Sequence, residues 1–330
     1  MLCNRCQLRR LTKPDIKARS TPVLPMPSIT ILLCTYNGAA HLEEQLASFR
    51  AQRQVDWDLW VSDDGSQDDT WAILETFAAA ERDRRTVRLV RGPQRGVAAN
   101  YLSLLCHPDL PAGPVALSDQ DDVWAPDKLA LAQAGLRRGG PVTLYGAQYH
   151  FADAALRPIG ASRPPQRPAG FANALTQNLV SGHTAALSAG ALDLVRRAGV
   201  KGDVPYHDWW LYQLVTGAGG DVVIDPARVL LYRQHDDNLL GAHRGLGASL
   251  RRAQLVLGRT YGAWVRDNLA ALRRAEALLS PGNRALLARL ETIPPHAGLR
   301  RPAALWRAGL YRQTRLTTAA FYLAAALGRV

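Results

Sequence analysis

The sequence contains little cysteine: Cys3, Cys6, Cys34 and Cys106 are the four thiols among 330 residues. Cys3 and Cys6 form one CxxC pair, with no second pair and no suitably spaced histidine. A structural zinc site needs four ligands, so we interpret this pair as part of a flexible terminus rather than a metal site. Four scattered thiols in a chain of this length indicate a reducing compartment, and we predict a cytoplasmic protein.

Long apolar runs and several phosphate-binding motifs are missing as well. No stretch reaches the roughly 18 apolar residues of a spanning helix, and no apolar core of signal-peptide length follows the Arg-rich N-terminus. No GxGxxG follows the first predicted strand, and neither GxxxxGKS nor GxxxxGKT occurs. These absences argue against a dinucleotide-dependent dehydrogenase and against a P-loop NTPase.

Acidic residues are scarce at both ends of the chain. The net charge is +12, and residues 243–330 alone, with fifteen Arg and three acids, also carry +12. Residues 1–27 carry +5, which leaves −5 on residues 28–242. We therefore predict a flexible basic leader, an acidic body and a basic helical extension over these three ranges. An acidic body suits a bound cation, whereas a basic extension suits anions such as lipid headgroups.

The body alternates between predicted strands and helices. Helical spacing, as at Leu42, Leu46 and Phe49, separates the β-rich runs from one another. These runs are residues 28–34, 59–62, 87–90 and 114–117. The alternation predicts an α/β fold with a mainly parallel sheet flanked by helices.

The pattern is less regular beyond the fourth run. Residues 153–170 contain four prolines and predict a long loop. We expect two short strands at 221–225 and 229–232, and helices from residue 246 onward.

Acidic turns follow two of the predicted strands. Asp63-Asp64 ends the second strand, and Asp119-Gln120-Asp121-Asp122 ends the fourth. In a parallel sheet these ends lie on one edge, beside Thr35-Tyr36-Asn37 after the first strand. Crowded carboxylates repel one another, and a hard divalent cation removes that conflict. The pattern predicts a pocket for a nucleotide with a cation, and a solvated acidic turn is the simpler alternative.

Three stretches carry a resemblance to a known family. ITILLCTYNG (29–38), LWVSDDGSQDDT (59–70) and ALSDQDDVWAPDK (116–128) resemble the N-terminal motifs of family 2 glycosyltransferases with the GT-A fold. SDQDDVW, together with the later HDWW and LYRQHDDNLLGA, is similar to the rhamnosyltransferase-like branch, which builds bacterial surface polysaccharides. The resemblance covers residues 28–242 and implies a nucleotide-sugar-binding GT-A domain there.

The resemblance also implies roles for individual positions. Asp64 would bind the base while Asp63 supports its loop, and Asp122 would support the acidic loop on the sugar side. The nucleotide-sugar donor would contact Thr35, Tyr36, Asn37, Asp63, Asp64, Asn100, Asp119 and Gln120. The divalent metal, Mg²⁺ or Mn²⁺, would be held by Asp121, Asp119 and His235, with Asp121 as the favoured ligand and a structural histidine as the alternative for His235.

Asp208 of the HDWW motif matches the position of the family's catalytic base. A carboxylate can take the proton of an acceptor hydroxyl while that oxygen attacks the anomeric carbon. No second nucleophile is needed, so the resemblance implies an inverting transfer by single displacement. It implies L-rhamnose, from dTDP-rhamnose, as the sugar and a hydroxyl of a surface glycan as the acceptor.

The acceptor side is expected to include Gly182, His183, Trp209 and Trp210. One tryptophan ring is expected in the core and the other against a sugar, because adjacent helical residues face different sides. Gly182 fits a close approach to a ligand or an ordinary turn. His183 fits a site residue or a satisfied polar residue.

Two alternatives and one further partner remain. A nucleotidyltransferase could use a carboxylate–metal site but needs a Gly-rich basic loop after the first strand. A nucleic-acid-binding protein should carry its positive charge across the folded body, so we expect no nucleic-acid partner.

Leu316–Leu327 spans only 12 residues, which suits a helix lying at a membrane interface near a lipid-linked acceptor, and packing on the domain is the alternative.

Overall fold

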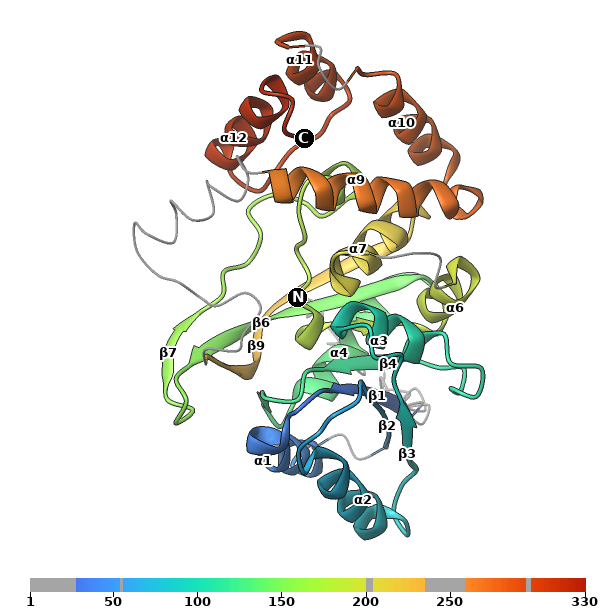
Figure 1. Ribbon diagram of the computed structural model, residues 1–330, viewed down its shortest axis with the longest axis vertical. Coiled ribbons are helices and arrows are strands. Elements are labelled where there is room, and N and C mark those ends of the chain that lie inside the picture. The colour runs from blue at the N-terminus through green and yellow to red at the C-terminus, as the bar shows by residue number, and fades with distance from the viewer. Residues whose placement is uncertain (1–27, 54–55, 200–203, 235–258, 295–297) are drawn as a thin grey trace, which may run out of the picture.

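The computed structural model describes residues 28–330 apart from 54–55, 200–203, 235–258 and 295–297 (Figure 1). The predicted leader and His235 lie outside the described residues. The expected boundary between body and extension, at residue 242, lies outside them too.

Four parallel strands form the first half of the sheet, as the sequence predicts. Their order is β3-β2-β1-β4, and neighbouring strands in this run are parallel. The strands are β1 (Ile29–Thr35), β2 (Trp57–Asp63), β3 (Val87–Arg91) and β4 (Val115–Ser118). The connecting helices are α1 (Ala39–Arg50), α2 (Thr70–Glu81) and α3 (Val97–Leu105).

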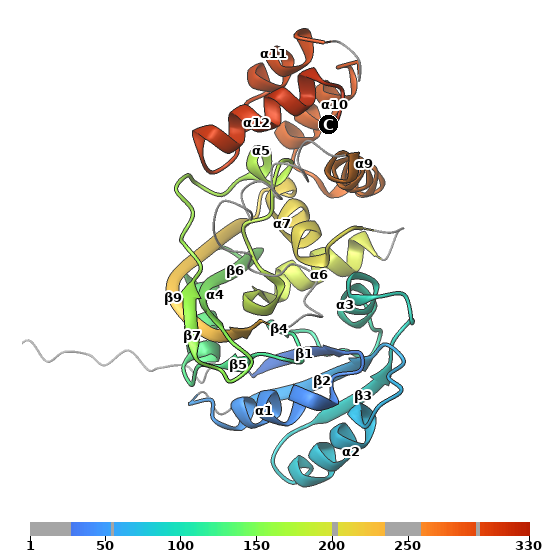
Figure 2. The ribbon, with the colours of Figure 1, turned by 60° about the vertical axis from the view of Figure 1, so that its left-hand side comes forward.

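Alternate side chains of β1 enter two different cores. Ile31 and Leu33 pack with α1 and α2, whereas Leu32 and Cys34 pack with α3 on the other face. Figure 2 shows α1 and α2 on one side of these strands and α3 on the other. A strand buried on both faces is therefore continuously apolar, as this run is.

The second half of the sheet is mixed. Its order continues β4-β8-β6-β9-β5, with β6 and β9 parallel, β7 beside β6, and the other pairs antiparallel. The strands are β5 (Val123–Trp124), β6 (Thr143–Ala152), β7 (Pro158–Ala161), β8 (Ala186–Leu187) and β9 (Asp221–Arg233). The helices of this half are α4 (Lys128–Arg138), α5 (Phe171–Ala174), α6 (Ala189–Ala198) and α7 (His207–Gly217).

Two predictions about this half are wrong. Residues 221–225 and 229–232 belong to one strand, β9, because the sheet tolerates Pro226 at a register shift between Asp225 and Arg228. Residues 153–170 include the edge strand β7, which starts at Pro158, a position where a missing N–H costs no ladder bond.

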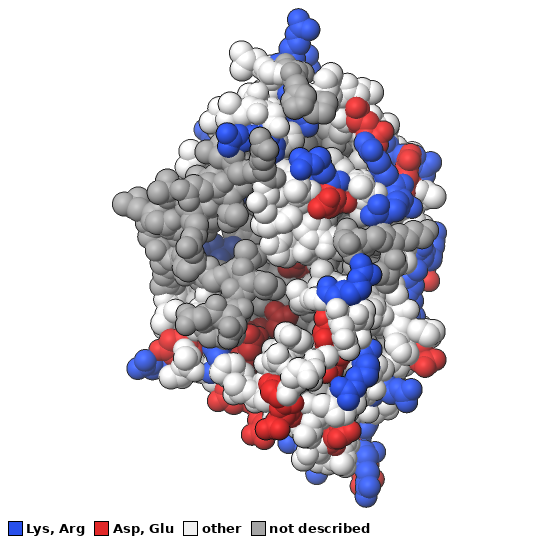
Figure 3. Space-filling model, in the orientation of Figure 1, with Lys and Arg blue, Asp and Glu red and all other residues white. Residues whose placement is uncertain are grey.

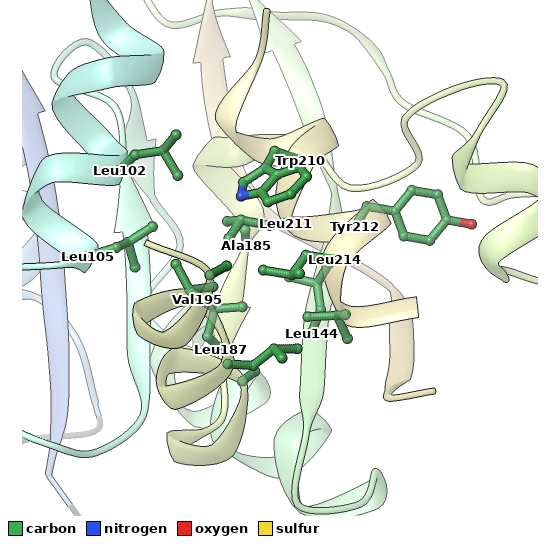
Figure 4. Packing of buried hydrophobic residues seen from close by; sticks show 14 of the residues in the cluster. Leu102, Leu105, Leu144, Ala185, Leu187, Val195, Trp210, Leu211, Tyr212 and Leu214 are labelled. Carbon is green, nitrogen blue, oxygen red and sulfur yellow. The ribbon is translucent and has the colours of Figure 1, made fainter. Parts of the chain in front are cut away.

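A buried cluster joins the two halves. Leu102 and Leu105 of α3 face Trp210 and Leu214 of α7, with Leu144 and Leu187 of the sheet beside them (Figure 4). This core fixes α7 against the parallel strands.

The C-terminal extension is helical, as predicted, and lies over α7 (Figure 1). It contains α9 (Arg259–Arg274), α10 (Pro281–Glu291), α11 (Arg300–Arg307) and α12 (Arg315–Ala326). Trp209 of α7 packs in one cluster with Tyr261, Leu305 and Phe321. Among the described residues, every helix is too short or too polar to span a membrane.

Gly135→Ala in α4 should destabilise the fold. Alanine gains about 1 kcal/mol of helix propensity over glycine. The new Cβ, however, would lie 2.2 Å from Cδ2 of Tyr145, whose ring is 0% exposed. Overpacking of this kind costs about 1–3 kcal/mol, so after the gain in helix propensity we expect a net loss of up to about 2 kcal/mol in urea denaturation.

Gly282→Ala in α10 is the matched control, because its new Cβ would meet nothing within 4 Å. We expect an unchanged or slightly raised midpoint. Similar shifts in the two variants would show that the contact with Tyr145 does not decide the outcome.

Candidate active site

Hydrogen bonds fasten the loops at the ends of β1 and β2 to each other. The Thr35 hydroxyl donates to Asp63 at 3.0 Å, and the Asn37 N–H donates to the Ser66 hydroxyl at 2.9 Å. Asn37 adopts a φ of 47°, a left-handed conformation that Asn tolerates better than most residues. Asp63 is 0% exposed, so it supports this loop from beneath rather than facing a ligand.

Gln120 joins the acidic loop to the end of β1. Its amide accepts from the Tyr36 N–H at 2.8 Å and donates to the Tyr36 carbonyl at 3.0 Å. A Cβ at Gly38 would lie 2.3 Å from the Gln120 side-chain oxygen, so a larger residue there would displace the Gln120 amide from Tyr36. The pairing leaves the Tyr36 ring 57% exposed, with a face open to a ligand.

Asp64 and Asn100 are both committed to the protein itself. Asp64 accepts from the N–H groups of Gln94 and Gly96, each at 2.7 Å. Asn100 is 1% exposed, and its amide donates to the Ser62 carbonyl at 2.9 Å. Asn100 therefore holds the end of β2, and the prediction that it contacts the donor is corrected by its burial.

Strand pairing brings His183 to the acidic loop. β8 runs antiparallel to β4, with Val115 opposite Leu187 and Ala116 opposite Ala186. Extending that register by three residues places His183, in the short helical turn Gly182–Thr184, opposite Asp119. The imidazole Nδ1 lies 3.6 Å from Asp119 and 3.5 Å from Asp122.

Asp119, Asp122 and His183 form what we call the Asp–Asp–His cluster. One ligand atom from each lies within 4.8 Å of the others. Asp119 is 34% exposed, whereas Asp122 is 0% and His183 is 6% exposed. The cluster therefore opens to solvent through Asp119. Asp121, the metal ligand that the sequence favoured, is not part of it, and its carbonyl accepts from Arg233 at 3.2 Å.

Burial sets the protonation of the cluster. Burial, followed by repulsion from Asp121 and Asp119, raises the pKa of Asp122 to about 8, against the attraction of His183 and Lys128. Its carboxylate oxygens have no hydrogen-bond partner among the described residues. Burial also opposes ionisation of Asp119, but its hydrogen bond to His183 and the charge of that ring lower its pKa.

Three further side chains around the cluster were not predicted as site residues, although Lys128 is the last residue of the third motif. The Tyr101 hydroxyl donates to Asp119 at 2.8 Å, and its ring stacks on His207 at 4.0 Å. Lys128 is 1% exposed and donates to the His183 carbonyl. Tyr149 meets the His183 ring edge-on at 4.6 Å. Tyr101 and Tyr149 come from a helix and a strand outside the acidic motif, so only the fold brings them to the cluster.

Asp208 lies in the first turn of α7, where the helix dipole favours a carboxylate. It accepts from the Gly182 N–H at 3.0 Å. A Cβ at Gly182 would lie 2.6 Å from His207 Nε2, so the close approach that requires glycine here is to a side chain of the protein itself. The same turn thus carries the contact to Asp208 and the ring of His183.

The expectation that Trp209 or Trp210 stacks on a sugar is wrong. Both are 4% exposed. Trp210 packs in the core between α3 and α7, and Trp209 packs against the extension while its indole donates to the Ala174 carbonyl at 2.7 Å. The two faces of the helix are buried against different neighbours, so neither ring remains for a ligand.

The surface around the cluster is acidic. Figure 3 shows acidic side chains gathered on the half of the molecule that holds the parallel strands, some of them within a recess. Such a recess suits a cation rather than a bare anion.

A family model described as glycosyl transferase family 2 matches residues 30–194, half of the chain. The chain belongs to this family. Membership makes it a glycosyltransferase and removes the nucleotidyltransferase and nucleic-acid-binding alternatives as descriptions of the whole protein.

Individual relatives agree with the family. The dTDP-rhamnosyl transferase RfbG of Shigella flexneri is 27% identical over 243 residues, which cover 69% of this chain and 80% of the relative. TarS 1–349 of S. aureus, solved in complex with UDP-GlcNAc, matches with a TM-score of 0.53 at 13% identity, over 86% of this chain and 93% of that one.

The mannosyltransferase PcManGT of Pyrobaculum calidifontis, solved in complex with GDP-Man and Mn²⁺, matches with a TM-score of 0.51 at 22% identity, over 92% of this chain and 87% of that one. The two structural similarities confirm the GT-A fold, and the sequence is similar to that of a dTDP-rhamnosyl transferase.

Tyr101→Phe should destabilise this family 2 site. The change removes a buried donor to an ionised carboxylate, which costs about 2 kcal/mol. Because the hydroxyl helps to lower the pKa of Asp119, the loss should be larger at pH 7 than below about pH 4, where carboxyls are protonated. Urea denaturation at the two pH values measures it.

Tyr145→Phe provides the comparison, since the Tyr145 hydroxyl is buried without a hydrogen-bond partner in the described parts of the chain. We expect no loss of stability at either pH. An equal loss in both variants would mean that the bond to Asp119 contributes nothing measurable.

Proposed function

We propose that the protein is an inverting, metal-dependent glycosyltransferase that moves a sugar from a nucleoside-diphosphate donor to a hydroxyl of a glycan. One observation carries the proposal. The turn Gly182–Thr184 fixes Asp208 through the Gly182 N–H, and its His183 ring completes the Asp–Asp–His cluster. A single turn therefore sets the position of a base relative to a cation-binding group.

The cluster fits a divalent cation. Asp122 is a buried carboxylate without a hydrogen-bond partner among the described residues, and a buried polar group in that condition calls for a ligand. Asp119, Asp122 and His183 would hold the ion, which when bound supplies positive charge against the leaving diphosphate. Two carboxylate oxygens and one imidazole nitrogen suit Mn²⁺ at least as well as Mg²⁺. The Mn²⁺ in the related mannosyltransferase structure supports this assignment.

Asp208 is the group that would act on the acceptor. Its carboxylate accepts the proton of the acceptor hydroxyl as that oxygen attacks the anomeric carbon, and the configuration inverts in one displacement. The N–H groups of Gly182 and Trp209 hold this carboxylate in place. A positioned base typically contributes about 10²–10⁴-fold to the rate.

For the donor we propose dTDP-L-rhamnose. The support is the 27% identity to a dTDP-rhamnosyl transferase together with the 57% exposed Tyr36 ring beside the loops of β1 and β2, which offers a stacking face for a base. The acceptor would be a hydroxyl on a bacterial surface polysaccharide, carried on a lipid. We place the enzyme in the cytoplasm, with its basic helices toward the inner face of the membrane.

Asp208→Asn should abolish transfer and preserve donor binding. Losing the proton acceptor should lower kcat at least 100-fold. The assay screens a panel of nucleotide sugars for release of nucleoside diphosphate, with and without Mn²⁺ or Mg²⁺.

Asp193→Asn, on the exposed face of α6, is the matched acid-to-amide control. Normal turnover by Asp208→Asn would place the base elsewhere. If no donor in the panel turns over or binds with either metal, the proposed function itself is wrong.

Asp122→Asn should weaken Mn²⁺ binding at least tenfold, because it removes a carboxylate from the cluster. Above pH 8, where Asp122 is ionised, it should also raise the thermal midpoint without metal, since a buried charge is replaced by a neutral amide. Calorimetric titration with Mn²⁺ alone measures the first effect.

Asp121→Asn is the critical comparison, since the motif favours Asp121 and the geometry favours Asp122. We expect the smaller loss of Mn²⁺ affinity in Asp121→Asn. A larger loss of Mn²⁺ affinity in Asp121→Asn than in Asp122→Asn would identify Asp121 as the metal ligand.

A further inference from the structure

A second cavity lies in the C-terminal extension, away from the Asp–Asp–His cluster. Its volume is about 390 Å³, and it is bounded by the end of α11, the first two turns of α12 and the loop before α5. Arg315, Thr318, Ala319 and Tyr322 line it from one face of α12, at the spacing of successive helical turns. The opposite wall includes Arg167, Trp306 and Tyr311.

The charge of this pocket is positive. Arg167 and Arg315 are its ionisable cations, and none of the described lining residues is acidic. The surrounding sequence has the same bias, because residues 292–330 contain six Arg and no Asp or Glu. The described residues around the pocket therefore offer this positive charge no acidic partner, and an anion is its complement.

Arg167 is held in position by the protein. Its guanidinium lies 4.0 Å from the centre of the Tyr311 ring and donates to the Arg312 carbonyl at 3.3 Å. The Tyr311 hydroxyl in turn donates to the Pro168 carbonyl at 2.8 Å. A guanidinium has five N–H donors in a planar fork, so one fixed bond leaves donors for a phosphate oxygen.

Apolar side chains stand exposed next to the pocket. Of the eight large hydrophobic residues that are exposed in the described chain, five lie between residues 299 and 327. Leu316, Leu323 and Leu327 are 80%, 54% and 55% exposed. At 100° per residue they form one stripe along α12, beside the face that lines the pocket. Trp306, in the pocket wall, is 66% exposed.

We propose that this pocket binds the phosphate group of a lipid, whose apolar chain lies along the Leu316–Leu327 stripe. Two arginines without acidic neighbours recognise the phosphate, and the leucines and Trp306 contact the hydrocarbon. Membrane phospholipid and a lipid-linked acceptor share this chemistry. The site goes beyond sugar transfer, because it requires neither the donor nor the metal.

Calorimetric titration of the full chain with three soluble probes tests the chemistry. Octyl phosphate carries both features, inorganic phosphate lacks the chain and octyl glucoside lacks the charge. We expect octyl phosphate, below its micellar concentration, to bind at least tenfold more tightly than either of the others. Equal binding of inorganic phosphate would identify a simple anion site, and equal binding of octyl glucoside would identify an apolar one; each overturns the proposal.

Paired variants test the location. Arg167→Gln with Arg315→Gln should weaken octyl phosphate binding at least tenfold. Arg300→Gln with Arg307→Gln removes the same amount of positive charge from exposed positions of α11 outside the pocket. This control should change the affinity for octyl phosphate less than twofold. Equal losses in the two double variants, or no loss in the first, would overturn the assignment to this pocket.

Vesicle flotation then separates the two lipid sources. The comparison uses phosphatidylcholine vesicles with and without phosphatidylglycerol. If vesicles that contain phosphatidylglycerol bind the wild type but not the double variant with Arg167→Gln and Arg315→Gln, the pocket accepts membrane phospholipid. If octyl phosphate binds and these vesicles do not, the lipid phosphate is a specialised one, such as an acceptor. The calorimetric titration and the vesicle flotation both omit the sugar donor. Their outcome is therefore independent of whether the protein transfers a sugar in the transferase assay.

Discussion

The burial of Asp122 beside Asp119 and His183 is the constraint on which the rest of the site depends. A carboxylate with no exposed surface and no hydrogen-bond partner among the described residues is costly, as its raised pKa reflects. The fold therefore surrounds it with compensating groups. Lys128 lies buried beside it, where burial lowers the pKa of the ammonium and the charges of Asp122 and Asp119 oppose that shift, and Tyr101 donates to the neighbouring Asp119. Stability alone does not account for such an arrangement, whereas a cation that completes the cluster does.

The position of this cluster follows from the change in strand direction between β4 and β8. Parallel strands bring acidic turns to one edge of a sheet, but they supply no partner from the opposite direction. The antiparallel β8 returns toward that edge and delivers the Gly182–Thr184 turn against the acidic loop. Gly182 must lack a side chain there, because His207 occupies the space. The mixed half of the fold thus supplies His183 and Asp208, and the parallel half supplies Asp119 and Asp122.

This division explains what the sequence could predict. The parallel half has short-range signals, namely apolar runs followed by acidic turns, and these predicted the strands and the acidic edge. The proposed role of Asp208 as the base rests on motif resemblance, since hydrogen bonding alone offers no distinctive pattern for it. The choice between Asp121 and Asp122 could not be predicted, because adjacent loop residues point in different directions that depend on contacts with Arg233 and His183. Likewise, the burial of Trp209 depends on an extension that begins some fifty residues later in the chain.

That extension is continuous with the catalytic domain rather than appended to it. Trp209, adjacent to the proposed base, stacks on Tyr261 of α9, and the Tyr261 hydroxyl accepts from Arg312 at 2.9 Å. Arg312 precedes α12 and offers its carbonyl to Arg167 in the lipid-phosphate pocket. A connected set of packed and hydrogen-bonded side chains therefore runs from the first turn of α7 to the pocket. Because the contacts from Trp209 to Arg312 are buried or partly buried, and only the last bond, from Arg167 to the Arg312 carbonyl, is exposed, a lipid held at the pocket would fix the orientation of Asp208 relative to the lipid surface. Basic composition alone could bring the protein to an anionic surface, but only this packing would give it a defined orientation there.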